Sequence, residues 1–208
     1  MTTQPRTILL ATANPAKLQR LMWLLDGLPL NVRVPAELGI QPPPVAEWGR
    51  DFVENAVEKA LAWSVLVPGV SVLTSDGGLR VPALGRRWDG LFTRRNSGLE
   101  AGNLRRIEHL LSLMDGLSGD ERACEWCEAL ALARDGVSLT NWTASGSGGV
   151  IVEHYVPAES DDQFWTESIR LQPSLGKLYR DMSDEELAYH DTVWPSLHGH
   201  VRAYFSRS

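Results

Sequence analysis

Residues Thr7–Leu25, TILLATANPAKLQRLMWLL, combine two kinds of hydrophobic pattern. The apolar run Thr7–Ala11 predicts a buried β-strand, and after Ala16 the apolar residues recur at the three- and four-residue spacing of a helix. Thr12-Ala13-Asn14-Pro15 forms the short connection between them. A strand, a loop and a helix in succession are typical of α/β proteins.

The rest of the chain continues this mixture of strands and helices. Serine at 183 with Glu186 predicts a capping box, and Pro195 suits the first turn of a last helix. We expect a single α/β domain over residues 1–208. The expected elements are helices at Arg50–Leu66 and Leu99–Met114 and strands at Val70–Thr74, Ala123–Ala133 and Val150–Val156.

Charge and hydropathy exclude two classes of partner. The net charge of -6 argues against general binding to nucleic acid, because such binding rests on many Lys and Arg contacts to phosphate. The sequence has no apolar run long enough to cross a membrane, and residues 1–6 lack the apolar stretch of a secretion signal. We therefore expect a cytoplasmic protein.

The two cysteines, Cys124 and Cys127, stand in the spacing C-x-x-C. A redox pair is one interpretation. However, they fall in an expected strand, where positions three apart point to opposite faces, and no second pair completes a zinc site. We interpret them as two structural thiols.

The loop Thr12-Ala13-Asn14-Pro15-Ala16-Lys17 is the first candidate site. Where a strand ends just before a helix, free backbone N–H groups, a hydroxyl, an amide and a lysine come together, and such groups hold anions. The alternative is a capped turn with a solvated lysine.

Ser75-Asp76-Gly77-Gly78 is the second candidate, because its glycines let a ligand approach the backbone beside a carboxylate. An Asp-Gly-Gly sequence is also an ordinary hairpin signal. A third feature is that only three of the 20 basic residues are lysines, at 17, 59 and 177. Either these survive by chance, or a compact ammonium is needed there for phosphate.

These segments, in this order, resemble the inosine triphosphate pyrophosphatase (Ham1-like) family over nearly the whole chain. The family's T-x-N-x-x-K is matched at Thr12, Asn14 and Lys17. Its E-x-G-x-x-F-x-E-N-A-x-x-K-A is matched at Glu47, Gly49, Phe52, Glu54, Asn55, Ala56, Lys59 and Ala60. Its D-D-S-G-L, P-G-x-x-S-A-R-x-S-G, F-G-Y-D-P and G-K patterns fall, with changes except in the last, at 75–79, 89–98, 164–168 and 176–177.

The resemblance implies an elongated mixed β-sheet flanked by helices, two lobes around a substrate cleft, and a homodimer. It implies hydrolysis of noncanonical purine nucleoside triphosphates to monophosphate and pyrophosphate with Mg²⁺, which prefers carboxylate and phosphate oxygens. By position, Asp76 would accept the proton of the attacking water, and Glu47 and Asp76 would bind the metal. The implied substrate-binding positions are Thr12, Ala13, Asn14, Lys17, Lys59, Gly77, Arg95, Phe164, Trp165, Thr166, Glu167, Lys177 and His190.

The chain departs from the family pattern at several of these positions. Ser75 replaces the first Asp of D-D-S-G, and Gly77 replaces its Ser. At the base end, Trp165 and Thr166 replace the G-Y of F-G-Y-D-P, and the closing S-H-R is absent, so His190 is the candidate replacement for its histidine. Selectivity for inosine therefore does not follow from the sequence. A nucleotide-binding protein without turnover, or a structural protein on the inherited fold, is the alternative.

Overall fold

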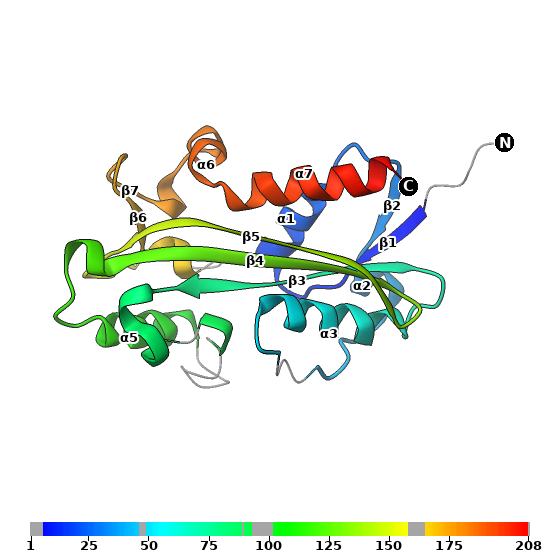
Figure 1. The fold of residues 1–208 in the computed structure, drawn as a ribbon, viewed down its shortest axis with the longest axis horizontal. Helices are drawn as coiled ribbons and strands as arrows, with labels where there is room; N and C mark the ends of the chain where they lie inside the picture. Colours follow the sequence, from blue (N-terminus) through cyan, green and yellow to red (C-terminus); the bar gives the residue numbers. More distant parts are fainter. Residues whose placement is uncertain (1–5, 46–48, 89, 93–101, 158–164, 208) are drawn as a thin grey trace. The chain divides into compact units, whose positions relative to one another are not determined.

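The computed structural model describes residues 6–45, 49–88, 90–92, 102–157 and 165–207 (Figure 1). Its strands are β1 Arg6–Leu10, β2 Leu30–Arg33, β3 Ser71–Arg80, β4 Ala123–Arg134, β5 Val137–Ile151, β6 Arg170–Gln172 and β7 Lys177–Leu178. Its α-helices are α1 Pro15–Leu25, α2 Pro35–Leu38, α3 Phe52–Ser64, α5 Asn103–Leu113, α6 Asp184–His190 and α7 Val193–Ser206. Short 3-10 helices are η1 Pro82–Arg87, η2 Gly90–Phe92, η3 Gly119–Arg122, η4 Trp165–Ser168 and η5 Tyr179–Asp181.

The strands form one mixed sheet in the order β2-β1-β3-β4-β5-β6-β7. Strand β1 pairs in parallel with both β2 and β3, whereas β6 pairs antiparallel with both β5 and β7. Parallel neighbours need a crossover connection, and here α1 and α3 lie in the segments that join β1 to β2 and β2 to β3. The expected α/β class with a mixed central sheet is confirmed.

The chain divides into two compact units. Unit 1 holds residues 1–76, 128–144 and 194–208, and unit 2 holds residues 77–127 and 145–193. In unit 1, α1 and α7 lie on one side of the strands and α3 lies on the other (Figure 1). A buried cluster on the α3 side joins Leu9, Ala11, Trp63, Val67 and Val72.

Unit 2 contains two buried arginines whose charges are shared among backbone carbonyls and rings. The guanidinium of Arg122 donates to the carbonyl oxygens of Met114, Leu117, Ile151 and Val152. That of Arg170 donates to Gly148 O and stacks 3.8 Å from the Tyr179 ring centroid. Because each is well paired, we assign both arginines to the scaffold of unit 2.

Five local predictions are confirmed. Strand β1 and helix α1 match the expected strand and helix at the start of the chain, and α3 falls inside the expected helix Arg50–Leu66. Helix α6 begins with the capping box of Ser183 and Glu186, and Pro195 lies in the first turn of α7.

Two strand predictions are wrong. Strand β3 does not stop at Thr74 but continues to Arg80, so Ser75-Asp76-Gly77-Gly78 is neither a loop nor a hairpin turn. Strand β5 begins at Val137 and ends at Ile151, whereas a strand was expected over Val150–Val156. Asp, Gly, Ser and Asn are poor strand formers, and in both cases pairing with neighbouring strands overrides the local preference.

The cysteines lie in β4, as expected; neither forms a disulfide, and each is 4% exposed. Strand β4 lies between β3 and β5 in the sheet, and both of its thiols are buried. The Cys124 thiol donates to Gly149 O. These contacts confirm two buried, separate thiols.

We expect both thiols to resist modification in the native protein. Burial raises the pKa of Cys124 to about 11, so the reactive thiolate is scarce at pH 8. A chromogenic disulfide reagent should therefore react slowly with the native protein, and two thiols per chain should react at once in denaturant. Rapid reaction of the native protein would contradict the observed burial.

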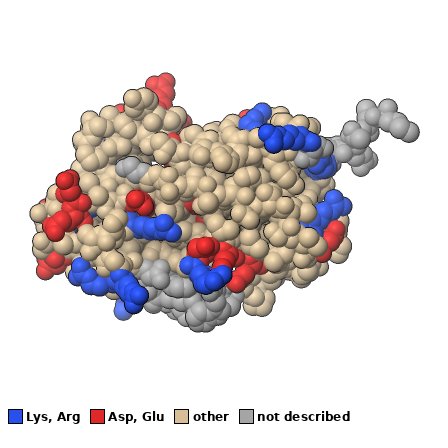
Figure 2. All heavy atoms as spheres, viewed as in Figure 1, with Lys and Arg blue, Asp and Glu red and all other residues tan. Residues whose placement is uncertain are grey.

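None of the helices in the described part of the chain is long and apolar enough to cross a membrane. On the face drawn in Figure 2, acidic and basic side chains are interspersed and do not gather into one basic surface.

Candidate functional site

The loop between β1 and α1 is held by its own polar side chains. Asn14 is the N-cap of α1, and its Oδ1 accepts hydrogen bonds from the backbone N–H groups of Ala16 (3.0 Å) and Lys17 (3.3 Å). The Thr12 hydroxyl accepts from the Asn14 N–H at 3.1 Å. Ala13 and Asn14 are exposed, so the loop presents its backbone to solvent at the start of a helix.

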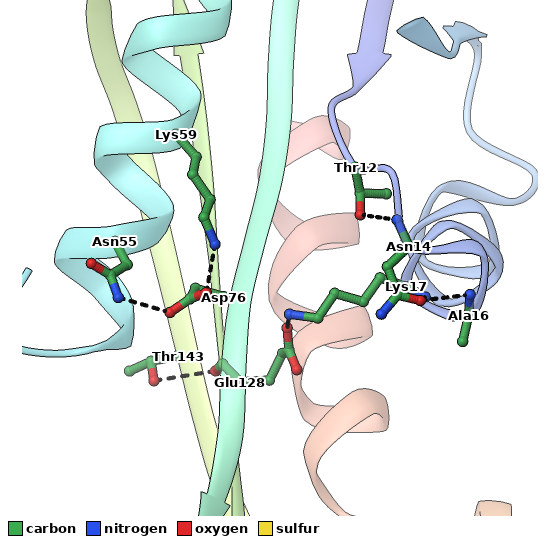
Figure 3. A network of polar contacts seen from close by, with 9 residues as sticks. All are labelled: Thr12, Asn14, Ala16, Lys17, Asn55, Lys59, Asp76, Glu128 and Thr143. Atoms are coloured by element: carbon green, nitrogen blue, oxygen red, sulfur yellow. Dashed lines mark hydrogen bonds and ion pairs between the residues drawn. The ribbon is translucent and has the colours of Figure 1, made fainter. Parts of the chain in front are cut away.

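Lys17 is not a solvated lysine. Its side chain is 14% exposed, and its Nζ lies 3.3 Å from Oε1 of Glu128, a fully buried carboxylate on β4. The turn is therefore capped, as one interpretation expected, but the lysine is directed inward (Figure 3). This ion pair anchors its ammonium to β4.

Asp76 lies in a second group of polar contacts in unit 1. Its Oδ1 accepts a hydrogen bond from Lys59 Nζ at 2.6 Å, and its Oδ2 accepts from Asn55 Nδ2 at 3.2 Å. Lys59 and Asn55 are four residues apart on α3, and both reach the carboxylate from the same helix face (Figure 3). Because both partners donate, the site fits an ionised carboxylate, which only accepts hydrogen bonds.

Asn55 is itself fixed by the loop before α3. The Gly49 N–H donates to Asn55 Oδ1 at 2.8 Å, which leaves Nδ2 to face Asp76. A Cβ on residue 49 would lie 2.6 Å from that Oδ1 and 2.8 Å from Asn55 N, so only glycine fits. Gly49 of the matched motif therefore fixes the orientation of the Asn55 amide.

The same helix is also tied to β3 at the residue after Asn55. The Thr74 hydroxyl donates to the carbonyl oxygen of Ala56 at 2.7 Å, and both residues are fully buried. Asp51 caps the start of α3 through the Glu54 N–H. These contacts hold α3 in register with the strand that carries Asp76.

Lys177 lies in unit 2, at the start of β7. Its Nζ is 2.6 Å from Oε1 of Glu186, and the lysine side chain is half exposed. The capping box at Ser183 fixes Glu186, and the Lys177 ammonium lowers the pKa of that carboxyl. Lys177 is thus an accessible cation with a fixed orientation.

The positions implied for base recognition also belong to unit 2. Trp165 packs edge-on against Trp88, with ring centroids 6.3 Å apart. Thr166 is 4% exposed, and its hydroxyl has no hydrogen-bond partner among the described residues. The His190 ring shares a hydrogen bond with Gln172 Nε2 at 3.1 Å, and Glu167 is half-buried in η4.

Three expected site residues lie outside the described part of the chain, and a fourth lies beside Asp76. Glu47, Arg95 and Phe164 lie outside the described residues, and Gly77 is half-buried in β3 next to Asp76. Within the described ranges, no group of three or more His, Cys, Asp or Glu side chains is arranged to hold a metal ion.

Sequence reasoning missed one polar residue of the site, Glu128. It lies in the run Glu128-Ala-Leu-Ala-Leu-Ala, which reads as an apolar strand. A charged residue at the edge of such a run is the signal that could have found it, since a central strand buries both of its faces. Burial raises the pKa of Glu128, the Lys17 ammonium lowers it, and the Asp76 charge raises it further.

Comparison with known families identifies one match over most of the chain. A model of the Ham1 family matches residues 8–187. The dITP/XTP pyrophosphatase of Xanthomonas axonopodis pv. citri is 33% identical over 178 residues, covering 85% of this chain and 86% of that protein. That of Yersinia pseudotuberculosis is 30% identical over 179 residues, covering 86% and 88%.

Solved structures have the same fold. A Ham1 protein from Coxiella burnetii superposes with a TM-score of 0.78 at 23% identity, covering 98% of this chain and 100% of that one. The nucleoside-triphosphatase / dITP/XTP pyrophosphatase from Mycobacterium abscessus has a TM-score of 0.64 at 23% identity, covering 96% and 97%.

Proposed function

Because the chain belongs to the Ham1 family, we propose that it hydrolyses noncanonical purine nucleoside triphosphates to the monophosphate and pyrophosphate. The observation that carries the proposal is the Asp76 carboxylate, held on both oxygens by Lys59 and Asn55. These three residues come from the two segments that match the family's patterns. A carboxylate fixed in this way is suited to take one proton from one direction.

The proposed chemistry divides among side chains of known type. Water attacks the α-phosphorus, its proton passes to Asp76, and pyrophosphate leaves. Lys17 and Lys177 neutralise phosphate charge. The Thr12 hydroxyl, whose oxygen accepts from the Asn14 N–H, still has a proton to donate to a phosphate oxygen. In such reactions most of the rate enhancement comes from positioning and charge stabilisation.

Lys59 has a different task in this proposal, although the resemblance implies a substrate-binding position. Its ammonium lies 2.6 Å from Asp76 Oδ1, so it keeps the carboxylate in place. Together with Asn55 it limits the rotation of the Asp76 side chain. The geometry favours a role for Lys59 in positioning Asp76, and this role does not require contact with phosphate.

The site also fits the divalent cation that the family implies. Each Asp76 oxygen accepts one of these two hydrogen bonds, and an ionised carboxylate has further lone pairs. Mg²⁺ prefers such oxygens, usually one or two carboxylates together with substrate phosphates. We propose that Asp76 and Glu47 hold Mg²⁺, which supplies charge neutralisation for the triphosphate when bound.

Base recognition is proposed to rest on residues that differ from the family pattern. Trp165 offers an aromatic face in place of the lost tyrosine, and stacking of a base on such a ring is worth about 1 to 3 kcal/mol whatever the base. His190, Thr166, Glu167, Phe164, Arg95 and Gly77 complete the proposed set. This arrangement predicts little discrimination among the noncanonical purine triphosphates ITP, dITP and XTP. We further propose that the protein is cytoplasmic and forms a homodimer. Light scattering of the purified protein would test the dimer.

Product analysis over a panel of nucleotides tests the proposed activity. With Mg²⁺, we expect ITP, dITP or XTP to give monophosphate and pyrophosphate in equal amounts, faster than ATP or GTP. A chelator in excess should stop the reaction, and added Mg²⁺ should restore it. Release of single phosphates, or no pyrophosphate from any triphosphate, would contradict the proposal.

A further inference from the structure

Glu128 is a fully buried carboxylate of β4 with one unpaired oxygen. Its Oε1 accepts from Lys17 Nζ, whereas its Oε2 has no hydrogen-bond partner among the described residues. Buried carboxylates are rare, and they are normally paired on both oxygens, because an unpaired buried charge is costly. A buried ion pair of this kind is weak evidence for a contribution to stability.

Ser75 is a second buried polar residue close to Glu128. It lies on β3, the strand next to β4, and it points away from the Asp76 face because side chains alternate along a strand. Its hydroxyl is also buried and makes no hydrogen bond of ordinary geometry to a described residue. Burial raises the pKa of the Glu128 carboxyl, and a looser contact with the Ser75 hydroxyl lowers it slightly. Two buried polar groups therefore lie close together on adjacent strands.

Position 75 is also where the family pattern has the first aspartate of D-D-S-G. In this chain β3 has Ser75 at that position, and the neighbouring strand β4 carries the carboxylate of Glu128 close to it. In Figure 3, Glu128 points toward Lys17, while Asp76 points toward Asn55 and Lys59. The two carboxylates thus hold different lysines.

We propose that Glu128 is a positioning residue that takes over, from the neighbouring strand, the place of the acidic group missing at position 75 and holds Lys17 ready for the phosphates. This inference rests on the proposed function, since it deepens the role of Lys17. The lysine stem is flexible, and ordering it during binding would weaken affinity. Glu128 orders it beforehand.

The sign of the effect separates this role from simple electrostatics. Removal of a negative charge near a phosphate site would by itself strengthen binding of the anionic triphosphate. Removal of an anchor would weaken it, because the Lys17 side chain must then be ordered at the moment of binding. Weaker binding therefore reports positioning.

The test measures binding without turnover. Calorimetry would follow the Mg²⁺ complex of the nonhydrolysable α,β-imido analogue of ITP. We expect Glu128→Gln, which keeps the shape and removes the charge, to bind about tenfold more weakly than the unaltered protein. Glu108→Gln is the matched control at an exposed position of α5, and it should bind normally.

A second variant returns the carboxylate to β3. Ser75→Asp/Glu128→Gln should recover affinity to within about threefold of the unaltered protein. Ser75→Asp alone should lower the melting temperature, because two buried carboxylates then share one lysine, and the double variant should not. These melting temperatures need no nucleotide, so they test the inference even if no triphosphate binds.

The outcomes separate the two proposals. If the unaltered protein neither binds nor cleaves any triphosphate, the proposed function fails. If it binds but Glu128→Gln binds equally well or more tightly, this inference alone is overturned. The same holds if Ser75→Asp fails to recover affinity in the double variant, or if Ser75→Asp alone leaves the melting temperature unchanged.

Discussion

Replacing Asp76 by asparagine should lower the rate of pyrophosphate release by between about 10² and 10⁴-fold, the usual contribution of a general base. The change removes the proton acceptor while keeping the shape of the side chain. It should also reduce the rate at saturating substrate, because proton transfer takes place in the transition state. Binding of the Mg²⁺ complex of the nonhydrolysable analogue should weaken too, because Asp76 is a proposed metal ligand, but by less than the rate falls.

The contacts of Asp76 predict a second effect of this variant. Both partners, Lys59 Nζ and Asn55 Nδ2, are donors, so the amide of an asparagine must turn its own NH₂ toward one of them. Such a mismatch costs about 1 to 3 kcal/mol of stability. Rates should therefore be compared at a temperature where both proteins are folded, as established from their melting curves.

Asp115→Asn is the matched control, since it makes the same chemical change at an exposed position just after α5. It should leave both rate and melting temperature unchanged. If Asp76→Asn is folded and turns over triphosphate within about threefold of the unaltered protein, Asp76 is not the general base. The proton would then have to pass to another group.

Gly149→Ala should be the most destabilising single-methyl change in unit 2. Gly149 has a φ of +79°, and an added Cβ would lie 2.2 Å from the carbonyl oxygen of Leu171 on β6. That oxygen cannot move freely, because Leu171 is paired with Val150 in the sheet. The left-handed backbone costs alanine about 1 to 2 kcal/mol, and the clash adds about 1 to 3 kcal/mol.

Gly116→Ala separates these two contributions. Gly116 has nearly the same φ, +77°, but a Cβ there would meet no described heavy atom within 4 Å. It should lose only the backbone contribution, about 1 to 2 kcal/mol. The melting temperature of Gly149→Ala should be lower than that of the unaltered protein by roughly 10 °C, and that of Gly116→Ala by less than half of that. Equal losses in both variants would mean that β6 moves to accommodate the methyl group.

The parts of the fold that the sequence predicts well are those set by local chemistry. The strand, loop and helix at Thr7–Leu25 follow from leucine spacing and the Asn14 cap, both of which act within a few residues. The extension of β3 through Asp76, Gly77 and Gly78 depends on neighbouring strands that lie far away in the sequence. Local propensity cannot reveal such pairing.

The same distinction applies to the candidate site. Helical spacing places Asn55 and Lys59 on one face, but only the fold shows that both reach Asp76. Likewise, Lys17 stands out as a rare lysine, whereas its partner Glu128 is separated from it by 111 residues. The sequence predicts which side chains are available, and tertiary structure decides which of them meet.

The amide of Asn55 has one further consequence for protein engineering. Its oxygen is bonded to the backbone two residues after Glu47, and its nitrogen is bonded to Asp76. One neutral side chain therefore links the segments that carry both proposed metal carboxylates, although it need not touch the ion. Cation preference should be adjustable at position 55, by altering the spacing of the two ligands while both carboxylates are left intact.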